Sequence, residues 1–335
     1  MYKIIGGVFF VGVLLLVSLF FLGNNSKDER TVSFEIEKGE NLWNTASNLK
    51  KEGIIESKIY FVWYVYKNDY RGKIKAGKYI LSSNLKVAEI VIILTEGDKS
   101  GERESKKITF PEGFSLGQMA ERLTESGFDG AGFLDLTKDP KYFADKYAFS
   151  FLSDIPEGKS LEGYLFPDTH SFFIEASAED IIVKILDNFD NRVSEDLTAE
   201  IKRQNKSIYE ILTMASIIEK ESNNAEDKKM VSGVFYNRIK NGQALQSCAT
   251  LAFVLGEDKS QYSYEDTQIN SPYNTYINVG LPPGPITNPG LDSIVAAIYP
   301  TKTNYIYFLN NPETKETIFS TTLEEHNLNK DRNGL

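Results

Sequence analysis

The sequence is poor in the residues that build disulfides and metal centres. Cys248 is the single cysteine among 335 residues, so the chain cannot form an internal disulfide or a thiolate metal cage. The two histidines, His170 and His326, are far apart in the sequence and lack the spacing of metal ligands. We therefore expect no zinc or haem centre and no cofactor.

Positive charge is also in short supply. The chain has 37 lysines and arginines against 47 aspartates and glutamates, a formal net charge of −10 at pH 7. An acidic chain has little attraction for a phosphate backbone, so nucleic acid is not an expected partner. Hydrophobic residues make up 41% and charged residues 25%, which is ordinary for a globular protein, and the length suits two or three domains.

The N-terminal segment lacks charge between Lys3 and Lys27, and residues 4–22 are almost wholly apolar. As a helix this run would be about 28 Å long, close to the thickness of the hydrocarbon layer of a bilayer. A cleaved signal peptide is the alternative, but it usually has a shorter apolar region and a small-residue cleavage site, which is not seen here. We therefore predict a transmembrane anchor over residues 1–24, with the rest of the chain outside the cell membrane.

Residues 25–104 are predicted to form a small α/β subdomain. The stretches VSFEIEKG and AGKYILSS have the pattern of strands, whereas NLWNTASNLKKEG and KVAEIVIILTEG have helical spacing. The aromatic stretch IYFVWYVYKN fits either a helix or a strand. The charged residues 97–107 are typical of a solvated linker.

The remainder of the chain is predicted to contain two further parts. Residues 105–200 would form a second α/β unit and a connecting region, and residues 201–335 a mainly helical domain with a β-hairpin at NYIYFLNNPETKETIFS. In that last domain Asn288 is predicted to be the N-cap of a helix. The expected fold class is α+β: an N-terminal transmembrane helix, an α/β subdomain and a C-terminal mainly helical domain.

The stretch MASIIEKES places two glutamates, Glu219 and Glu221, on an apolar helix whose start is marked by a capping-box pattern at Ser207 and Glu210. Helical phase puts Glu219 within the apolar stripe and Glu221 nearly opposite. Either could be a working acid, because an apolar wall raises the pKa of a carboxyl group. Spacing alone also allows two solvated glutamates at a helix end, or Glu219 paired with a cation such as Arg238.

The stretch SPYNTYINVGLPPGPITNPG, which begins at residue 271, has neither helical nor strand periodicity. It presents Tyr273, Asn274, Thr275 and Tyr276 ahead of several prolines that stiffen the backbone. Aromatic faces beside amide and hydroxyl groups suit a sugar, which has apolar faces and a rim of hydroxyls. A long structural loop is the alternative that composition leaves open.

Several long motifs occur together in one order: TMASIIEKES, VFYNRI, LQS, SPYNTYINVGLPPGPITNPG, LDSIVAAIYPTKTNYIYF and a late His326-Asn327. With EGYLFPDTHSF and the apolar N-terminus, they make the chain resemble the endolytic murein transglycosylases, the MltG or YceG-like family, over nearly its whole length. The resemblance implies that residues 25–104 are LysM-like and that residues 201–335 are the transglycosylase catalytic domain. It also implies that Glu221, followed by Ser222, is the catalytic residue.

The activity that the resemblance implies is lytic cleavage of nascent peptidoglycan strands. Glu221 would protonate the oxygen between N-acetylmuramic acid and N-acetylglucosamine, and its carboxylate would then take a proton from the muramic C6 hydroxyl. The products would be 1,6-anhydro ends, and such cuts would terminate strand elongation. The residues expected to bind the substrate are Gln246, Tyr273, Asn274, Thr275, Tyr276 and Glu162.

The resemblance also implies the partners and the location. We expect peptidoglycan glycan strands as substrate, a single-pass anchor in the cytoplasmic membrane, an extracytoplasmic catalytic domain, and peptidoglycan synthases as partners. The chain departs from the family pattern at Cys248-Ala249, where many relatives have Asp-Pro, and at His170, where Tyr is common. Any role of that aspartate is therefore missing or moved here.

Three alternatives stay open. A glycan-binding scaffold without turnover would explain the anchor, the LysM-like unit and the aromatic loop equally well. A cysteine hydrolase would use Cys248 with His326 or His170 as base, although no motif places a base beside the thiol. A water-using muramidase of the lysozyme type would leave reducing ends instead of anhydro ends.

Overall fold

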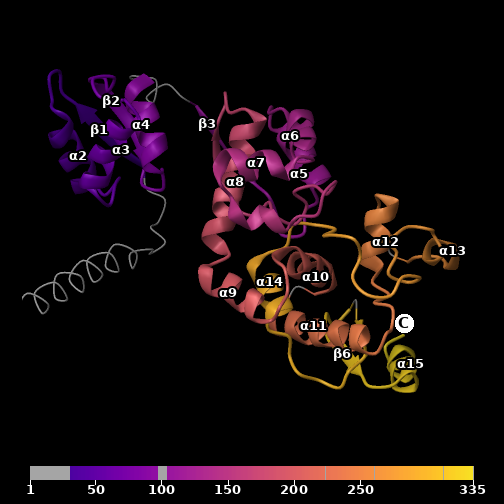
Figure 1. Ribbon diagram of the computed structural model, residues 1–335. Helices are drawn as coiled ribbons and strands as arrows, with labels where there is room; N and C mark the ends of the chain where they lie inside the picture. The colour runs from indigo at the N-terminus through magenta and orange to yellow at the C-terminus, as the bar shows by residue number, and fades with distance from the viewer. Residues whose placement is uncertain (1–30, 97–103, 223, 260, 312, 335) are drawn as a thin grey trace, which may run out of the picture. The chain divides into compact units, whose positions relative to one another are not determined.

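The computed structural model describes residues 31–96, 104–222, 224–259, 261–311 and 313–334 (Figure 1). The chain divides into two compact units, with the boundary after Glu104. Each unit has its own cluster of buried hydrophobic side chains. The first unit therefore has a core that does not depend on the second. The finer domain boundaries expected from the sequence, and the LysM-like character of the first unit, stay predictions.

Over its described residues, the first unit combines a two-stranded antiparallel sheet with three helices. Its elements are β1 (Thr31–Ile36), α2 (Leu42–Lys51), α3 (Lys58–Lys67), β2 (Gly77–Ser82) and α4 (Val87–Glu96). Alternate side chains of the strands, such as Phe34 on β1 and Leu81 on β2, point into the core. The aromatic stretch that fitted either a helix or a strand is helix α3, because the side chain of Ser57 caps its first turn by accepting from the N–H of Tyr60.

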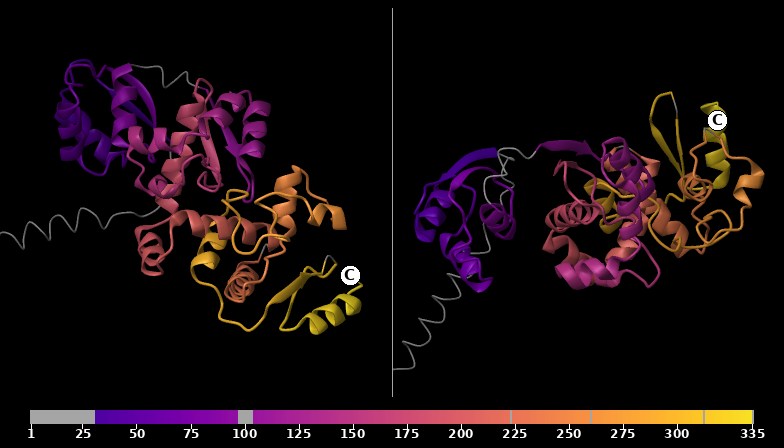
Figure 2. Two further views of the ribbon diagram at one scale, coloured as in Figure 1. Left: turned by 45° about the vertical axis from the view of Figure 1, so that its right-hand side comes forward. Right: turned by 90° about the horizontal axis from the view of Figure 1, so that it is seen from above.

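The second unit, in the part that the structure describes, is mainly helical and carries two small antiparallel sheets. Its elements are β3 (Ser105–Thr109), α5 (Leu116–Glu125), α6 (Gly130–Leu136), α7 (Pro140–Tyr147), the 3-10 helix η1 (Ser150–Asp154), β4 (Thr169–Phe173), α8 (Ala178–Arg192), α9 (Glu195–Arg203), α10 (Ile208–Glu221), α11 (Ala225–Lys240), α12 (Cys248–Leu255), α13 (Tyr264–Thr267), α14 (Leu291–Ile298), β5 (Tyr307–Asn310), β6 (Thr317–Ser320) and α15 (Leu323–Arg332). The predicted C-terminal hairpin is confirmed as β5–β6. Figure 2 shows this hairpin beside α15, with which both strands are in contact.

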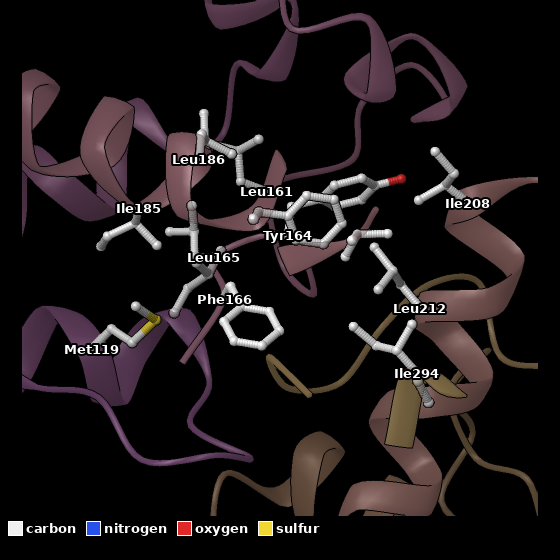
Figure 3. Close-up of a cluster of buried hydrophobic side chains, with 14 of the residues drawn as sticks. Met119, Leu161, Tyr164, Leu165, Phe166, Ile185, Leu186, Ile208, Leu212 and Ile294 are labelled. Carbon is white, nitrogen blue, oxygen red and sulfur yellow. The ribbon is translucent and has the colours of Figure 1, made fainter. Parts of the chain in front are cut away.

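One hydrophobic cluster runs through the second unit, on both sides of residue 200. Figure 3 shows part of it, where Met119 of α5 and Ile185 of α8 lie in the same core as Leu212 of α10 and Ile294 of α14. Helix α10 contacts α9, α11, α12, α14 and η1. The helix that carries both glutamates is thus held from several directions, which gives its C-terminal end a fixed position.

The start of α10 agrees with its sequence pattern, but its burial does not. The predicted capping box is confirmed, since the hydroxyl of Ser207 accepts from the N–H of Glu210 at 3.0 Å and the carboxylate of Glu210 accepts from the N–H of Ser207 at 2.8 Å. From Ile211 to Glu219 every residue of the helix is buried, instead of those along one stripe, whereas Glu210 in the first turn is exposed. A helix that is apolar on every side lies inside the protein. Helical phase nonetheless identified the more buried glutamate, because Glu219 is buried and Glu221 is only partly buried.

Among the residues that the structure describes, no helix is long and apolar enough to cross a membrane. The longest of them, α11, has 16 residues, whereas a membrane span needs about 20 apolar residues. The fold-class prediction is corrected accordingly: the described architecture is α+β and it includes no transmembrane helix. The segment predicted as the anchor, residues 1–24, lies outside the described residues.

Candidate active site

Glu219 is a structural carboxylate. It forms an ion pair with Lys228 of α11 at 2.9 Å, and both side chains are buried. Its second oxygen accepts from the N–H of Gly290 at 2.9 Å and from the hydroxyl of Ser293 at 2.7 Å. The alternative of a cation as its partner is therefore confirmed, but the cation is Lys228 and not Arg238. These contacts join α10 to α11 and to the start of α14, so the carboxylate of Glu219 stabilises the fold.

Glu221 is the last residue of α10, and its carboxyl group is partly buried. The hydroxyl of Ser247 donates to its Oε1 at 2.5 Å. Burial raises the pKa of this carboxyl above its usual range, and the bond from Ser247 opposes that rise. Among the described residues, no second carboxylate contributes to the raised pKa. The result is a single carboxyl group biased toward its protonated form, with one oxygen held by a hydroxyl.

Ser247 is held in place by the aromatic loop that begins at residue 271. Its N–H donates to the hydroxyl of Thr275 at 3.1 Å, and the N–H of Gln246 donates to the carbonyl of Thr275 at 2.9 Å. The hydroxyl of Thr275 also shares a 2.9 Å hydrogen bond with that of Thr250 on α12. Ser247 is 2% exposed, so its hydroxyl has little freedom to turn away from Glu221.

Gln246 has a strained backbone, with φ at +54° in the left-handed region that residues other than glycine rarely adopt. Two hydrogen bonds from Arg238 hold Leu245 and Gln246 in place. One guanidinium nitrogen donates to the side-chain oxygen of Gln246 at 2.9 Å, and another donates to the carbonyl of Leu245 at 2.7 Å. Arg238 in turn lies over the ring of Tyr307, 5.3 Å from its centre. The side-chain oxygen of Gln246, expected to bind substrate, is therefore engaged in orienting the next residue, Ser247.

Tyr276 lies on the Glu221 side of the loop. Its hydroxyl is 3.1 Å from the thiol of Cys248, which begins α12. Burial raises the pKa of both groups, and the charge of Glu221 raises each further. Tyr276 is thus the predicted sugar-binding aromatic that the structure brings near the acid.

Asn274 and Thr275 have a different role from Tyr276, because both are buried. The side-chain amide of Asn274 donates to the carbonyls of Thr267 and Ile269 at 3.0 and 2.8 Å, and its oxygen accepts from the N–H of Tyr276 at 2.9 Å. All of these contacts lie within the loop or its approach. The structure therefore assigns the Asn274 and Thr275 side chains to shaping the loop.

Glu162 and Tyr273 form a second group. Both oxygens of Glu162 accept from the N–H of Leu116 at 3.1 Å, and one also accepts from the amide of Asn288 at 3.0 Å. Burial raises the pKa of Glu162 to about 8 despite these bonds, and the charge of Glu162 adds to the burial that raises the pKa of Tyr273. The ring of Tyr273 packs against Phe253 at 4.8 Å. In the part of the chain that the structure describes, no hydrogen bond joins this group to Glu221.

Asn288 ties distant segments together and does not cap a helix. It is fully buried, and its side-chain oxygen accepts from the N–H groups of Gly163 and Leu165, each at 2.9 Å. The N-cap of α14 is Gly290, so the prediction of Asn288 as N-cap is wrong. A buried amide with partners on two other chain segments, around Phe114 and around Gly163, stabilises the fold more than one at an exposed helix end.

The described contacts of Cys248 disfavour a cysteine hydrolase. Its thiol contacts Tyr276, and burial raises the pKa of the thiol, which keeps it from forming the reactive thiolate. His170 lies in β4 among Phe110 and Phe172, and His326 stacks on a tyrosine of β5. Neither histidine contacts the thiol in the described part of the chain.

A carboxyl group with a raised pKa, held by a serine hydroxyl, is chemically able to donate a proton to a leaving group. The comparisons with known proteins identify the family. Residues 34–332 match the model of the YceG-like family. The chain therefore belongs to the YceG-like family, as its motifs predicted.

Individual relatives cover most of the chain. An endolytic murein transglycosylase of Bacillus subtilis strain 168 is 34% identical over 98% of this chain and 91% of its own length. One of Streptococcus pneumoniae strain D39 is 32% identical over 96% of this chain, which spans 62% of that longer relative. A crystal structure of a yceG-like protein from Listeria monocytogenes is 37% identical, has a TM-score of 0.61, and covers 90% of this chain and 100% of its own.

Ser247 was not singled out from the sequence, although it stands in the LQS motif. The signal was present as a hydroxyl residue inside one of the motifs on which the resemblance to the family rests. Nothing local, however, links it to Glu221, which lies 26 positions earlier.

Proposed function

We propose that the protein cuts peptidoglycan glycan strands internally at the bond between N-acetylmuramic acid and N-acetylglucosamine, leaving 1,6-anhydro ends. By family the chain is a lytic transglycosylase, as its curated relatives are by name. The observation that carries the proposed chemistry is the single carboxyl group of Glu221, whose pKa is raised by burial and whose Oε1 accepts from Ser247.

In the first step Glu221 acts as acid. Its proton moves to the bridging oxygen, the bond from that oxygen to C1 of the muramic acid breaks, and the N-acetylglucosamine side leaves as an alcohol. A carboxyl group that keeps its proton to higher pH is suited to this step, and burial raises the pKa of Glu221 in that direction. Because Ser247 donates to Oε1, we assign the transferred proton to Oε2.

In the second step the same group acts as base. The Glu221 carboxylate takes the proton of the C6 hydroxyl, and the C6 oxygen bonds to C1 of the same muramic acid. The proton count of Glu221 is restored and no water is consumed. Ser247 stabilises the intermediate carboxylate, since a hydrogen bond to a charged oxygen is stronger than one to a neutral oxygen. One carboxyl group is therefore sufficient, whereas hydrolytic glycosidases generally use two.

The aromatic loop supplies the groups that would hold the sugar. We assign Tyr276 to the ring next to the acid, because its phenol lies within the electrostatic reach of Glu221. Tyr273, which is half-buried against Phe253, is assigned to a more distant sugar, together with Glu162. Asn274, Thr275 and Gln246 act through the loop and through Ser247.

The test is product analysis of digested peptidoglycan by mass spectrometry. The Glu221→Gln variant keeps the shape of the side chain but cannot deliver a proton, and we expect release of anhydro fragments to fall by about 10²–10⁴-fold. Lys220→Gln is the matched control, because it changes an exposed charge one position earlier on the same helix. Its release of anhydro fragments should equal that of the wild type.

Two outcomes would replace the proposal. Reducing ends in place of anhydro ends would identify a water-using muramidase. Retained glycan binding with no cleavage by the wild type would identify a scaffold.

The biological role follows from where such cuts would be made. Internal cleavage of new strands would limit their length and so terminate elongation, and the site of action would be the extracytoplasmic cell wall. Peptidoglycan synthases, which make these strands, are the partners we propose. Comparison of strand-length distributions in cells with wild-type protein and with Glu221→Gln would test the role, because loss of termination should lengthen the strands.

A further inference from the structure

Helices α2 and α3 of the first unit contact each other (Figure 1). Together they carry an exposed aromatic face. We define this face by Trp43 of α2 and by Tyr60, Trp63 and Tyr66 of α3, whose exposed fractions are 48%, 45%, 48% and 52%. The opposite side of α3 is buried in the core. Large rings that are half exposed together are unusual on a protein surface unless a partner covers them.

Positive charge surrounds the aromatic face. Lys58 lies over the ring of Trp43 at 4.8 Å, Lys67 over Trp63 at 4.6 Å, and Arg71 over Tyr66 at 5.1 Å. Residues 41–80 contain eight lysines and arginines against three aspartates and glutamates, a net charge of +5 in a chain whose net charge is −10. The charge of this segment is therefore opposite in sign to that of the protein as a whole.

We propose that the aromatic face docks on the surface of an anionic lipid bilayer. Trp and Tyr rings favour the boundary between headgroups and acyl chains, and the lysine and arginine heads beside them would meet lipid phosphates. The long stems of these cations can lie along the rings while their charged ends stay in water. Rings and cations are thus arranged as a peripheral membrane contact requires.

Other occupants fit the aromatic face less well. A sugar stacks on the open face of a ring, but Trp43, Trp63 and Tyr66 each have a cation over the ring face. A second copy of the chain would bring two positive surfaces together, which repel each other. An extended anionic surface would attract the lysine and arginine side chains and would also cover the exposed rings.

Intrinsic fluorescence tests the proposal directly, because Trp43 and Trp63 are the only two tryptophans of the chain. The full chain is mixed with vesicles of phosphatidylcholine alone, or of phosphatidylcholine with phosphatidylglycerol, with and without brominated acyl chains. We expect tryptophan emission to move to shorter wavelength and to be quenched by the bromines in the anionic vesicles. In neutral vesicles both the wavelength shift and the quenching should be weak. Attachment by another part of the chain, with the aromatic face left in water, would produce neither effect.

A charge-reversed variant measures the contribution of the cations. In Lys58→Glu/Lys67→Glu/Arg71→Glu the lipid concentration for half-maximal quenching should rise by roughly fivefold or more per residue, since one cation near an anionic surface contributes about 1 kcal/mol. The matched control reverses three exposed lysines of the second unit. These are Lys141, Lys202 and Lys240. The control should bind like the wild type.

A salt titration of the wild type covers the case in which the charge-reversed variant fails to fold. Salt at about 1 M shortens the screening length to about 3 Å and should abolish the quenching. Equal quenching in neutral and anionic vesicles, or quenching that survives high salt, would overturn the proposal. So would an emission change with purified glycan strands and none with lipid.

Discussion

Removal of the Ser247 hydroxyl should shift the pH dependence of the reaction rate. The proposed role of Glu221 as acid sets the direction of that shift. The hydroxyl donates to Oε1 of Glu221 at 2.5 Å and lowers the pKa that burial raises. In Ser247→Ala the opposing effect is lost, so the pKa of Glu221 rises further. Because the reaction begins with protonated Glu221, the alkaline limb of the profile should move to higher pH.

The magnitude follows from the strength of the bond. A hydrogen bond to a charged group contributes about 1.5–3 kcal/mol, and one pKa unit corresponds to about 1.36 kcal/mol, so the limb should move by about one to two units. Below the limb the rate should fall by about 10- to 150-fold, because the developing carboxylate loses the same stabilisation in the transition state.

The assay is the initial rate of anhydro-fragment release from purified peptidoglycan, measured across pH for each variant. Ser247→Thr retains a hydroxyl and should restore much of the wild-type profile. Ser216→Ala is the matched control, since it removes another buried hydroxyl, from α10 itself, that does not touch Glu221. It should lower thermal stability and leave the limb in place. An alkaline limb that stays put or moves to lower pH in Ser247→Ala would refute the reasoning.

Three further predictions concern residues that support the site. In Glu219→Gln the buried charge of Lys228 loses its partner, so the free energy of unfolding in urea should fall by about 3–5 kcal/mol, and adding Lys228→Met should recover most of it. For Glu162, burial raises the pKa of the folded state from 4.5 to about 8, so its stabilising contribution is complete below pH 4.5 and is lost as pH rises toward 8. Glu162→Gln should therefore gain thermal stability relative to wild type between pH 5 and pH 9. At position 246, where φ is +54°, Gln246→Gly should be more stable than Gln246→Ala by about 1 kcal/mol, because only glycine adopts this backbone without strain.

Each of these predictions has a contrary result. Unchanged stability in Glu219→Gln would mean that Lys228 finds another partner or water. A difference between Glu162→Gln and wild type that is constant with pH would show that Glu162 keeps an ordinary pKa when folded. Equal stability of the glycine and alanine variants at position 246 would show that the backbone relaxes once the Arg238 contact is gone.

Local signals were sufficient for the elements of the fold. The capping box at Ser207, the apolar run of α10 and the C-terminal hairpin were all predicted, because each depends on residues a few positions apart. The ambiguous aromatic stretch was settled as a helix by the cap of Ser57. The same approach failed for burial around α10, since periodicity does not reveal how many neighbours pack on a helix.

The details of the site depend on contacts that no local pattern contains. Ser247 reaches Glu221 across 26 positions, and Asn288 reaches Gly163 across 125. The partner of Glu219 was mistaken for the same reason, because Arg238 and Lys228 are both on α11 and only the packed structure selects between them. The family motifs identified the segments that meet around Glu221. The contacts that each residue makes within those segments could be read only from the three-dimensional structure.

The position of Glu221 at the very end of α10 has a consequence for its acidity. The peptide dipoles of a helix sum to a partial negative charge at the carboxyl terminus, which repels an anion placed there. The same helix that Glu219 locks in place therefore discourages Glu221 from ionising, and it does so without any neighbouring acid. This placement costs some helix stability, and it favours a carboxyl group that keeps its proton to higher pH, as the proposed role of Glu221 requires.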